Sequence, residues 1–567
     1  MKRTLSAPSA KSTPHVDAAN RYAKGVVSGK IPANKWVKLA CKRHLDDMAR
    51  QKDRAFAYRF DANAAEKWCK FIELLPHIKG EWARKAQNLT LEPWQCFKTI
   101  CIFGWLRKDD GLRRFRKALI LEPRKNAKST WAAAIGLGML TIDNEHGAEI
   151  YSGATTEKQA WEVFKPARLM AIKRPQLLQH FGVTVNASNI HILGDGSKFE
   201  PMIGNPGDGA SPSCAIVDEY HEHDTDVMVD TMETGMGARE QPLLLIITTA
   251  GDNLAGPCYA AVQEAEKVLD GIIENDELFA LIYGVDKDDD WTSDLALRKA
   301  NPNYDISVKG EFLRARQRDA IQNARKVGVF KTKHLNMWVQ ARDAYFNIQR
   351  WQESADTGLK LEDFKGKPCR IGVDLASTVD IAAIELTFEH GDGFARFGRY
   401  YLPEATIELP ENEHYRGWRD APEKWITQTD GDMIDYVTIR DDLLQLRDDG
   451  FMIAEVAFDP HQAMMMMAEL QAEGYETVEV RPLTLNFSPA MKQMDGLIRS
   501  RKIVHNGDPV FTWMLSNVVA KPDAKDNVYP RKNRPENKID GPVAHMMALA
   551  RWMAVQEATP EYQMLIL

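Results

Sequence analysis

The pattern of apolar and polar positions changes character along the chain. Residues 1 to about 20 are rich in Ser, Pro, Ala and Lys and are expected to be disordered. From Arg21 to Ile78 apolar residues recur at helical spacing, on a face formed by Trp36, Leu39, Leu45, Phe56, Trp68 and Phe71. From Leu91 onward short apolar strands alternate with helical stretches, the strands being Lys117–Leu121, Glu149–Ser152, Cys214–Asp218 and Leu243–Thr249. The alternation predicts an α/β fold with a mostly parallel, doubly wound sheet.

The pattern changes twice more towards the C-terminus. Residues 260–355 are helical and strongly charged, which indicates a lid or linker region. A second strand-rich block begins at Arg370 and ends in a helix near Val543–Val555. A chain of 567 residues is too long for one hydrophobic core. We therefore predict four segments, with boundaries at residues 1–85, 86–265, 266–355 and 356–567.

Composition is that of an ordinary globular protein, with 44% hydrophobic and 27% charged residues. No apolar run approaches the roughly 20 residues that cross a bilayer, and the N-terminus lacks the apolar stretch of a secretory signal. The seven cysteines are scattered without a C-x-x-C pair, which favours reduced core positions over a zinc module or disulfides. We therefore expect a protein that works in a cytoplasm and has no membrane partner.

The net charge of −7 conceals an asymmetry. Residues 1–60 contain 14 Lys or Arg and 4 Asp or Glu, a net charge of +10, so the remainder carries −17. A basic arm on an acidic body can hold nucleic acid locally. A solvated helical surface explains the same charges equally well.

A phosphate-binding loop is indicated after the first of these strands. The segment from Glu122 to Thr130 reads Glu-Pro-Arg-Lys-Asn-Ala-Lys-Ser-Thr and leads into an Ala-rich helix. Such a loop needs backbone N–H groups at a helix N-terminus, a Lys for the phosphates and a hydroxyl for Mg²⁺. Lys128 and Ser129 match these roles. Glu122 and Ala127 stand where glycines are usual, and a Lys-Ser pair also opens many ordinary helices.

Two further strand ends supply the partners that such a loop requires. Asp218 and Glu219 follow an apolar strand, as do the Mg²⁺-orienting acid and the water-polarising acid of a P-loop ATPase, although a solvated turn begins the same way. Thr248 and Thr249 end a third strand, where a residue can sense the γ-phosphate. Upstream, Trp94 and Gln95 offer a ring and an amide for adenine, but Trp94 is also a natural core residue.

The second block carries three acids in suggestive positions. Asp374 ends an apolar strand, a second strand returns from Asp380, and Gly393–Leu402 supplies a third. Asp459 ends another strand and Asp540 begins the last helix. Hydrolysis of a phosphodiester by two metal ions needs about three converging carboxylates, and hard oxygen ligands select Mg²⁺ or Mn²⁺. Taken singly, Asp459 also fits a turn before Pro460 and Asp540 a helix N-cap.

From about Leu91 to Arg551 these motifs resemble the large terminase subunit of tailed bacteriophages. The loop from Pro123 to Ser129 is similar to that family's deviant Walker A motif, Val217-Asp218-Glu219 to its Walker B motif, and Thr248-Thr249-Ala250-Gly251 to its coupling motif. The family usually has Gly where Ala127 stands; Ala tolerates the start of a helix. The resemblance extends to Asn301-Pro302-Asn303, Asn336–Trp338 and the segment around Asp540.

The resemblance implies residue roles in two sites. It implies ATP bound by Arg124, Lys125, Asn126, Ala127, Lys128, Ser129 and Thr130, with Mg²⁺ on Ser129 and Asp218 and with Glu219 as the catalytic acid. Arg124 is the implied arginine for the transition state, and Arg239 is the weaker alternative. It further implies an RNase H-like nuclease with Mg²⁺ or Mn²⁺ on Asp374, Asp459 and Asp540. Asp380 and His545 are auxiliary candidates, although His545 lies about 140° around the helix from Asp540.

The resemblance also implies a biological role. By it, residues 86–265 form the ATPase domain of a motor that moves double-stranded DNA into a procapsid, and residues 356–567 form the nuclease that cuts concatemeric DNA. The implied partners are double-stranded DNA, a small terminase subunit, the portal protein and further copies in a ring, with the protein in the host cytoplasm and transiently docked on the portal. Two other interpretations are a cellular helicase-nuclease or repair ATPase, and a non-catalytic DNA-binding assembly protein with a vestigial P-loop.

Overall fold

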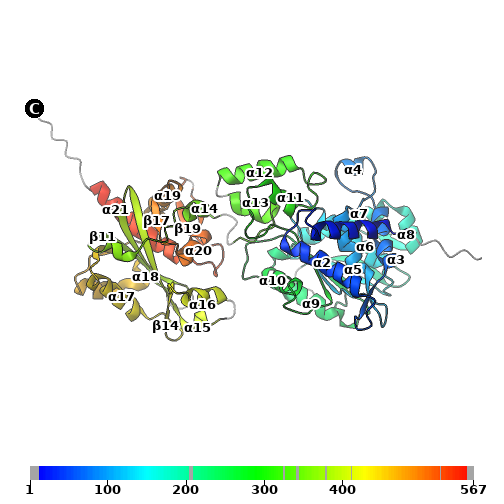
Figure 1. Ribbon diagram of the computed structural model, residues 1–567, viewed down its shortest axis with the longest axis horizontal. Helices are drawn as coiled ribbons and strands as arrows, with labels where there is room; N and C mark the ends of the chain where they lie inside the picture. Colours follow the sequence, from blue (N-terminus) through cyan, green and yellow to red (C-terminus); the bar gives the residue numbers. More distant parts are fainter. Residues whose placement is uncertain are drawn as a thin grey trace, which may run out of the picture. The chain divides into compact units, whose positions relative to one another are not determined.

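The computed structural model describes residues 12–203, 209–323, 326–339, 344–376, 380–409, 412–523 and 525–558. It divides into two compact units (Figure 1). Unit 1 comprises Met1–Ile321 and Phe330–Val339, and unit 2 comprises residues 322–329 and 340–567. Each unit contains its own central β-sheet.

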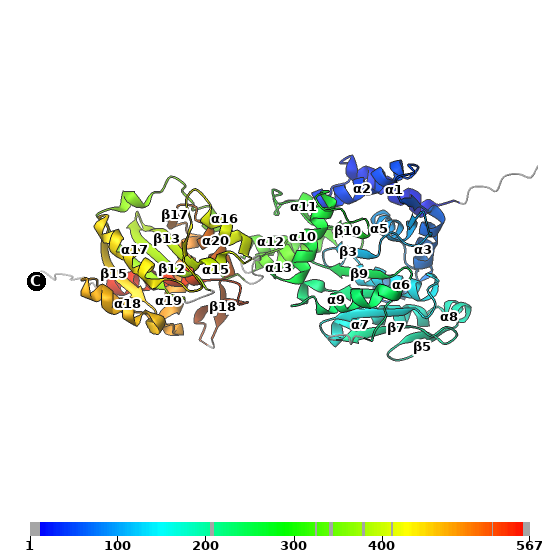
Figure 2. The same cartoon turned by 90° about the horizontal axis from the view of Figure 1, so that it is seen from below.

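The sheet of unit 1 has eight strands among the described residues. Its order is β10 (Leu278–Ile282), β3 (Lys117–Leu121), β9 (Leu243–Thr248), β8 (Cys214–Asp218), β4 (Glu149–Ala154), β7 (Ser197–Ile203), β6 (Ile190–Ile192) and β5 (Val183–Val185). The strands from β10 to β7 are parallel, and β6 and β5 are antiparallel. Figure 2 shows β10, β3 and β9 side by side. β10 lies in the region for which the pattern predicts only helices, so the sheet extends beyond that prediction.

Helices bury both faces of this sheet. α6 (Lys128–Thr141) is apolar all round and contacts α3 (Ala62–Leu74), α7 (Glu157–Ile172) and the strands β4, β7 and β8. A helix of this kind belongs in an interior. Gly138 allows the close approach of α3, because a Cβ there would lie 2.3 Å from the Trp68 ring.

The N-terminal helices belong to the same core. α1 (Pro14–Val27), α2 (Lys35–Arg50), α3 and α5 (Pro93–Gly104) pack together and contribute buried residues to the hydrophobic core of unit 1. α2 has its N-cap at Asn34, whose side chain accepts a hydrogen bond from Val37 N. The prediction of disorder to about residue 20 is wrong from Pro14 onward, because Val16 and Ala19 are buried core residues.

The sheet of unit 2 has seven strands among the described residues. Its order is β14 (Ile426–Thr429), β13 (Gly393–Pro403), β12 (Ala382–His390), β11 (Pro368–Asp374), β15 (Met452–Phe458) and β16 (Thr477–Glu479), with β17 (Ile503–His505) paired to β13. β11, β12 and β13 are antiparallel, whereas β15 and β16 are parallel to β11. This arrangement and the sheet of unit 1 confirm the predicted fold class.

Each face of the second sheet has its own hydrophobic core. α17 (Tyr436–Asp448) and α18 (Pro460–Ala472) contribute to one core, and α19 (Thr484–Arg499), α20 (Pro509–Asn517) and α21 (Asp540–Ala558) to the other. α21 lies directly on β11, because a Cβ on Gly372 would be 1.8 Å from the Ala544 carbonyl oxygen. Only a glycine at residue 372 allows this approach, which brings the start of α21 towards the end of β11.

Two compositional predictions can be checked directly. All seven cysteines are buried and unpaired, which confirms their assignment to core positions. Within the described part of the chain, no helix is both long and apolar enough to span a membrane.

Candidate functional site

The predicted phosphate-binding loop connects β3 to α6. Lys125 and Ala127 both have left-handed backbone conformations, with φ of 73° and 69°. Ala127 therefore does not adopt the helix-start conformation expected for it. The left-handed region carries no side-chain penalty for glycine but a cost for alanine, so the loop keeps its curled shape without the usual glycine at residue 127.

A neighbouring segment holds the loop in this shape. The Asn126 side chain donates to the Pro123 carbonyl and to Asn301 Oδ1, both at 3.1 Å, and accepts from Asn303 N at 3.0 Å. Asn126, Asn301 and Asn303 are all buried. Because buried amides need their hydrogen bonds satisfied, these contacts fix the loop against the Asn301-Pro302-Asn303 segment.

The first residues of α6 face the acids at the end of β8. Ser129 Oγ donates to Asp218 Oδ2 at 3.0 Å, and Lys128 Nζ lies 3.0 Å from Glu219 Oε1. Burial, together with the neighbouring Glu219 charge, raises the pKa of Asp218 to about 6, against the opposing effect of Lys128. Burial alone would raise the pKa of Glu219 as well, but Lys128 and His221 hold it below its ordinary value.

The end of β9 joins this cluster through a residue that the sequence analysis missed. His221 Nδ1 lies 3.0 Å from Thr248 Oγ1 and 3.3 Å from Glu219 Oε2, and Thr249 Oγ1 lies 3.4 Å from the same ring. Thr248 and Thr249 are fully buried. Glu219 itself is left-handed, with φ of 52°. A histidine two residues after an Asp-Glu pair was the available signal for this contact.

The two candidate arginines have different surroundings. Arg124 lies close enough to Glu219 for its charge to lower that residue's pKa, and within the described part of the chain its buried Nε has no hydrogen-bond partner. Arg239 instead donates to the carbonyls of Gly147 and Ser211 and to Glu149. Its donors are occupied within the fold, which favours Arg124 for contact with a nucleotide.

Glu122, at the other position where a glycine is usual, forms a fully buried ion pair with Lys98. The Lys98 ammonium also lies 4.6 Å from the ring centroid of Trp94 and 4.1 Å from that of Trp131. Burial raises the pKa of Glu122 and lowers that of Lys98, and the attraction between them opposes both shifts. A buried acid without its cation is strongly destabilising, so Lys98 and Glu122 are expected to stabilise the fold only as a pair. Glu122 is the first residue after β3, at the start of the loop.

A cavity of about 660 Å³ opens beside the loop. Its lining includes Ala127, Ser129, Thr130 and Gln95, and two rings not identified from the sequence, His77 and Trp82. These rings lie 4.7 Å apart between centroids on and beside α4 (Gly80–Arg84). Trp94 does not line this cavity. Its indole donates to Asn303 Oδ1 at 2.7 Å in the core, which favours the alternative that Trp94 is structural.

In unit 2 the three predicted acids lie at element ends. Asp374 is the last residue of β11, Asp459 is the N-cap of α18, and Asp540 is the first residue of α21. Asp459 Oδ1 accepts a hydrogen bond from His461 N at 3.0 Å, so Asp459 also has the capping role considered for it. All three side chains are half-buried.

The charges of these acids interact. Burial raises the pKa of Asp374 well above its ordinary value, and the charges of Asp540 and Asp459 raise it further. Burial and Asp380 raise the pKa of Asp540 to about 6. Because like charges perturb each other only at short range, the fold has brought together acids that lie 85 and 81 residues apart in sequence.

The two auxiliary candidates differ. Asp380 Oδ1 lies 2.8 Å from Lys532 Nζ and 2.6 Å from Lys538 Nζ, and these lysines, which the sequence analysis did not single out, lower its pKa against the effect of burial. His545 is fully buried, with Nδ1 3.1 Å from Thr387 Oγ1. Burial lowers the pKa of His545 to about 3. It points into the core of unit 2, where it packs against Phe511.

The acid cluster has the chemistry of a hard-cation site. Asp540 Oδ2 is buried and has no hydrogen-bond partner among the described residues, and burial and the charges of Asp540, Asp459 and Asp380 raise the pKa of Asp374 against the effect of Lys532. Excess carboxylate charge with only oxygen donors fits Mg²⁺ or Mn²⁺. Among the described residues, however, no three His, Cys, Asp or Glu side chains already form a metal-binding group.

Comparisons with known proteins cover both units. The chain matches the family model of the terminase large subunit ATPase domain over residues 93–267 and that of the terminase large subunit endonuclease domain over residues 272–557. Protein YmfN of Escherichia coli (strain K12) is 42% identical over 363 residues, which cover 62% of this chain and 80% of that protein.

Phage proteins are also among the relatives. The large terminase subunit of Enterobacteria phage HK97 is 25% identical over 484 residues, covering 82% of this chain and 91% of that protein. The crystal structure of the HK97 large terminase covers 86% of this chain and 99% of its own, at 23% identity and a TM-score of 0.42.

Proposed function

This chain belongs to the family of phage terminase large subunits, the ATPase-and-nuclease subunits of DNA-packaging motors, and we propose how its residues divide that work. Lys128, Ser129, Asp218 and Glu219 serve ATP hydrolysis, and Asp374, Asp459 and Asp540 serve DNA cutting. One observation carries the proposal: each unit gathers acids at the end of a central strand, where burial and neighbouring charges shift their pKa values. Such perturbation is characteristic of functional sites.

In the ATPase site, Lys128 exchanges partners. With phosphates present, its ammonium leaves Glu219 for the β- and γ-phosphate oxygens, and the freed Glu219 carboxylate orients the attacking water. Ser129 and Asp218 hold the Mg²⁺ that accompanies the nucleotide. Arg124 neutralises charge that develops on the γ-phosphate, and Thr248 and Thr249 pass the loss of that phosphate to β9.

The base of the nucleotide occupies the cavity beside the loop. Gln95 offers an amide to the adenine edge, and the exposed Trp82 ring offers a surface for stacking. Lys125, Asn126, Ala127 and Thr130 contribute backbone and side-chain contacts along the phosphates.

In the nuclease site, Asp374, Asp459 and Asp540 hold Mg²⁺ or Mn²⁺, with Asp380 as a further ligand once Lys532 and Lys538 turn to the DNA backbone. The ions supply an activated water and stabilise the leaving oxygen when bound. The residues of this chain position the scissile phosphate and supply the negative charge that makes cation binding favourable.

The same family membership suggests the partners. Double-stranded DNA is the polymer that the motor moves and the nuclease cuts, a small terminase subunit selects it, and the portal of the procapsid receives it. A homo-oligomeric ring of these chains in the host cytoplasm, docked on the portal during packaging, surrounds the DNA. DNA contact directed at the backbone suits translocation, because it does not depend on base sequence.

The proposal is tested on the full-length chain with two assays. Plasmid cleavage in Mg²⁺ or Mn²⁺ and ATP hydrolysis are measured for the wild type and for Asp374→Ala. We expect Asp374→Ala to lose cutting and keep ATPase activity, because the two sites are separate. If the wild type, assembled with DNA and portal, neither cuts nor hydrolyses ATP, the residue assignments are wrong.

A further inference from the structure

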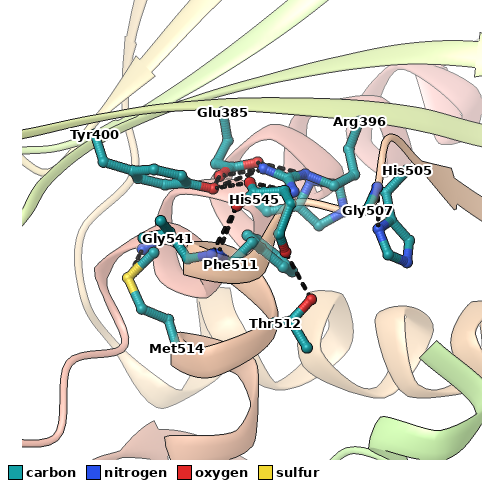
Figure 3. A network of polar contacts seen from close by, with 12 residues as sticks. Glu385, Arg396, Tyr400, His505, Gly507, Phe511, Thr512, Met514, Gly541 and His545 are labelled. Atoms are coloured by element: carbon teal, nitrogen blue, oxygen red, sulfur yellow. Dashed lines mark hydrogen bonds and ion pairs between the residues drawn. The ribbon is translucent and has the colours of Figure 1, made fainter. Parts of the chain in front are cut away.

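Four buried side chains of unit 2 form a polar network near the start of α21 (Figure 3). They are Glu385 on β12, Arg396 and Tyr400 on β13, and Asp508 at the N-cap of α20, and none is more than 1% exposed. Arg396 makes two bonds to Glu385, at 2.7 and 2.9 Å, and one to Asp508 at 2.8 Å. The network holds two carboxylates and only one cation.

The contacts of the Tyr400 hydroxyl determine where a proton lies. This oxygen is 2.7 Å from Glu385 Oε1 and 2.7 Å from Asp508 Oδ2, and it accepts from Arg396 at 2.8 Å. A phenol has one proton to donate. For both short contacts to be hydrogen bonds, one carboxyl group must also carry a proton.

Glu385 is the group that carries it. Burial raises the pKa of Glu385 to about 8, with the Asp508 charge adding to the shift and Arg396 opposing it. With Glu385 neutral, Arg396 and Asp508 cancel and the buried network has no net charge. Ionised, the network carries one uncompensated negative charge in a dry interior, which is costly.

The network touches the nuclease site through Tyr400 and Gly541. A Cβ added to Gly541 would lie 3.2 Å from Tyr400 Cε1, 3.3 Å from Phe511 Cδ2 and 2.5 Å from Met514 Cε, so these three side chains form the surface on which the first turn of α21 lies. Asp540 is the residue immediately before Gly541. Across the sheet, Tyr400 pairs with Ala383, and Ala383 pairs with Asp374.

Three other titratable neighbours of Glu385, namely His545, His505 and Tyr400, are uncharged near neutrality. His545 on α21 and His505 on β17 are neutral, because burial lowers their pKa values to about 3 and about 4. Burial raises the pKa of Tyr400 well above its ordinary value. The pKa of Glu385, about 8, by contrast lies between pH 6 and pH 9, so Glu385 changes charge in this range.

We propose that Tyr400 is a positioning residue of the nuclease, held by Glu385, Arg396 and Asp508 so that its ring supports Gly541 and fixes Asp540 relative to Asp374. This inference rests on the proposed nuclease function. Loss of the Glu385 proton leaves too few donors for the contacts of the Tyr400 hydroxyl and loosens the support. Small displacements of a ligand are costly in catalysis, where about 1 Å can reduce the rate 10²-fold.

The first experiment is the pH profile of plasmid cleavage for the full-length wild type and Glu385→Gln. The amide cannot ionise but keeps a donor and an acceptor. We expect kcat of the wild type to fall by about tenfold as the pH rises through about 8 and then to level off, because the support is loosened while the metal ligands remain, and Glu385→Gln to show no such fall. ATP hydrolysis on the same samples is the control and should follow one profile in both proteins. Identical alkaline falls in cleavage would overturn the proposal.

A second pair of variants separates positioning from general stability. Tyr400→Phe removes the hydroxyl from the network, whereas Tyr401→Phe removes a buried hydroxyl on the opposite face of the sheet, where it donates to Asp442 at 2.6 Å. We expect kcat for cleavage to fall about tenfold in Tyr400→Phe only, with KM for DNA unchanged in both. Equal effects on kcat mean a structural role and overturn the inference. A wild type that cuts at no pH removes the nuclease assignment and this inference together.

Discussion

In unit 1 the acids at the end of β8 form hydrogen bonds and ion pairs with other residue types. In unit 2 the acids at the ends of β11 and β15 and at the start of α21 interact with one another through their charges. Asp218 accepts from Ser129, and Glu219 pairs with Lys128 and His221. Asp374 is destabilised in its charged form first by burial and then by the repulsion of Asp540 and Asp459, while Lys532 and Lys538 pair with Asp380. The two sites thus hold similar acids with different neighbours: a lysine, a histidine and a hydroxyl contact those of unit 1, and the charges of other acids raise the pKa of Asp374 in unit 2.

This difference in neighbouring groups predicts different effects of ligand binding at the two sites. The ATP site is preorganised, with Lys128 occupying a place that nucleotide binding takes over. The nuclease site stores unfavourable charge that a divalent cation would relieve. ATP binding is therefore expected to exchange existing contacts, and metal binding to add new ones that also stabilise unit 2.

The largest expected effect is the loss of ATP hydrolysis, without loss of DNA cutting, when Lys128 is replaced. Lys128→Ala should reduce ATP hydrolysis about 10³-fold or more, because Lys128 is the cation proposed to leave Glu219 for the β- and γ-phosphates, and should leave Mg²⁺-dependent cutting unchanged. Steady-state ATPase and plasmid assays measure both. The exposed neighbour Lys125→Ala is the matched control, with a loss below about tenfold. Equal losses in the two variants would contradict the role of Lys128.

The ionised carboxylate of Asp374 is expected to destabilise unit 2 when no divalent cation is bound. The pKa of Asp374 is raised in the folded chain, so its contribution to stability is present at low pH and is lost as pH rises past the ordinary value of 3.8 towards the folded value. At pH 8 without divalent ions, Asp374→Asn should therefore unfold at a higher temperature than the wild type. Mg²⁺ at about 100 times its Kd should stabilise the wild type by about 2.7 kcal/mol and the variant by less. Thermal unfolding of both proteins with and without Mg²⁺ measures these differences. If Asp374→Asn is less stable than the wild type in EDTA, the ionised Asp374 does not destabilise the fold.

A smaller effect sharpens the contrast at the base of the nucleotide. Trp82→Ala should raise KM for ATP by about tenfold with kcat nearly unchanged, because it removes a stacking surface worth about 1 kcal/mol or slightly more. Trp94→Phe should alter KM little, since Trp94 lies in the core. The same ATPase titration measures KM for both variants. A larger rise in KM for Trp94→Phe than for Trp82→Ala would indicate that the adenine base contacts Trp94.

The smallest effect tests the loop. Ala127→Gly should stabilise unit 1 by about 1 kcal/mol or less, because glycine carries no penalty at φ of 69° but loses more entropy on folding. Ala133→Gly, in the interior of α6, should destabilise by about 1 kcal/mol. Denaturant unfolding of both variants provides the comparison, and destabilisation by Ala127→Gly would show that its left-handed conformation is not the strained feature.

Much of the fold could be predicted because the signals are local. β3, β8, β9 and β11 are short apolar runs, and Asp218, Asp374 and Asp540 stand where those runs end or a helix begins. β10 escaped prediction because five apolar residues in a charged, helical region carry little periodicity. Trp82 was missed since α4 has only five residues and none is buried.

Pairings between distant residues were beyond local reasoning. His221 beside Thr248, Lys98 with Glu122, and the two lysines on Asp380 each join positions whose spacing in the chain says nothing about their distance in space. The division at residues 85, 265 and 355 stays a prediction, as do the individual roles of the site residues.

The sequence by itself determined the chemistry of this protein: which acids follow apolar strands, where a Lys-Ser pair opens a helix, and the α/β alternation that places them. These depend on residue type and on the periodicity of neighbouring residues. Tertiary structure decided which acids lie close enough to shift one another's pKa values, and that Ala127 has a left-handed backbone. It also decided that α21 packs closely on β11 at Gly372 and on Tyr400 at Gly541. Those outcomes depend on the packing of segments that lie far apart in the chain, and a glycine in a sequence does not reveal what approaches it.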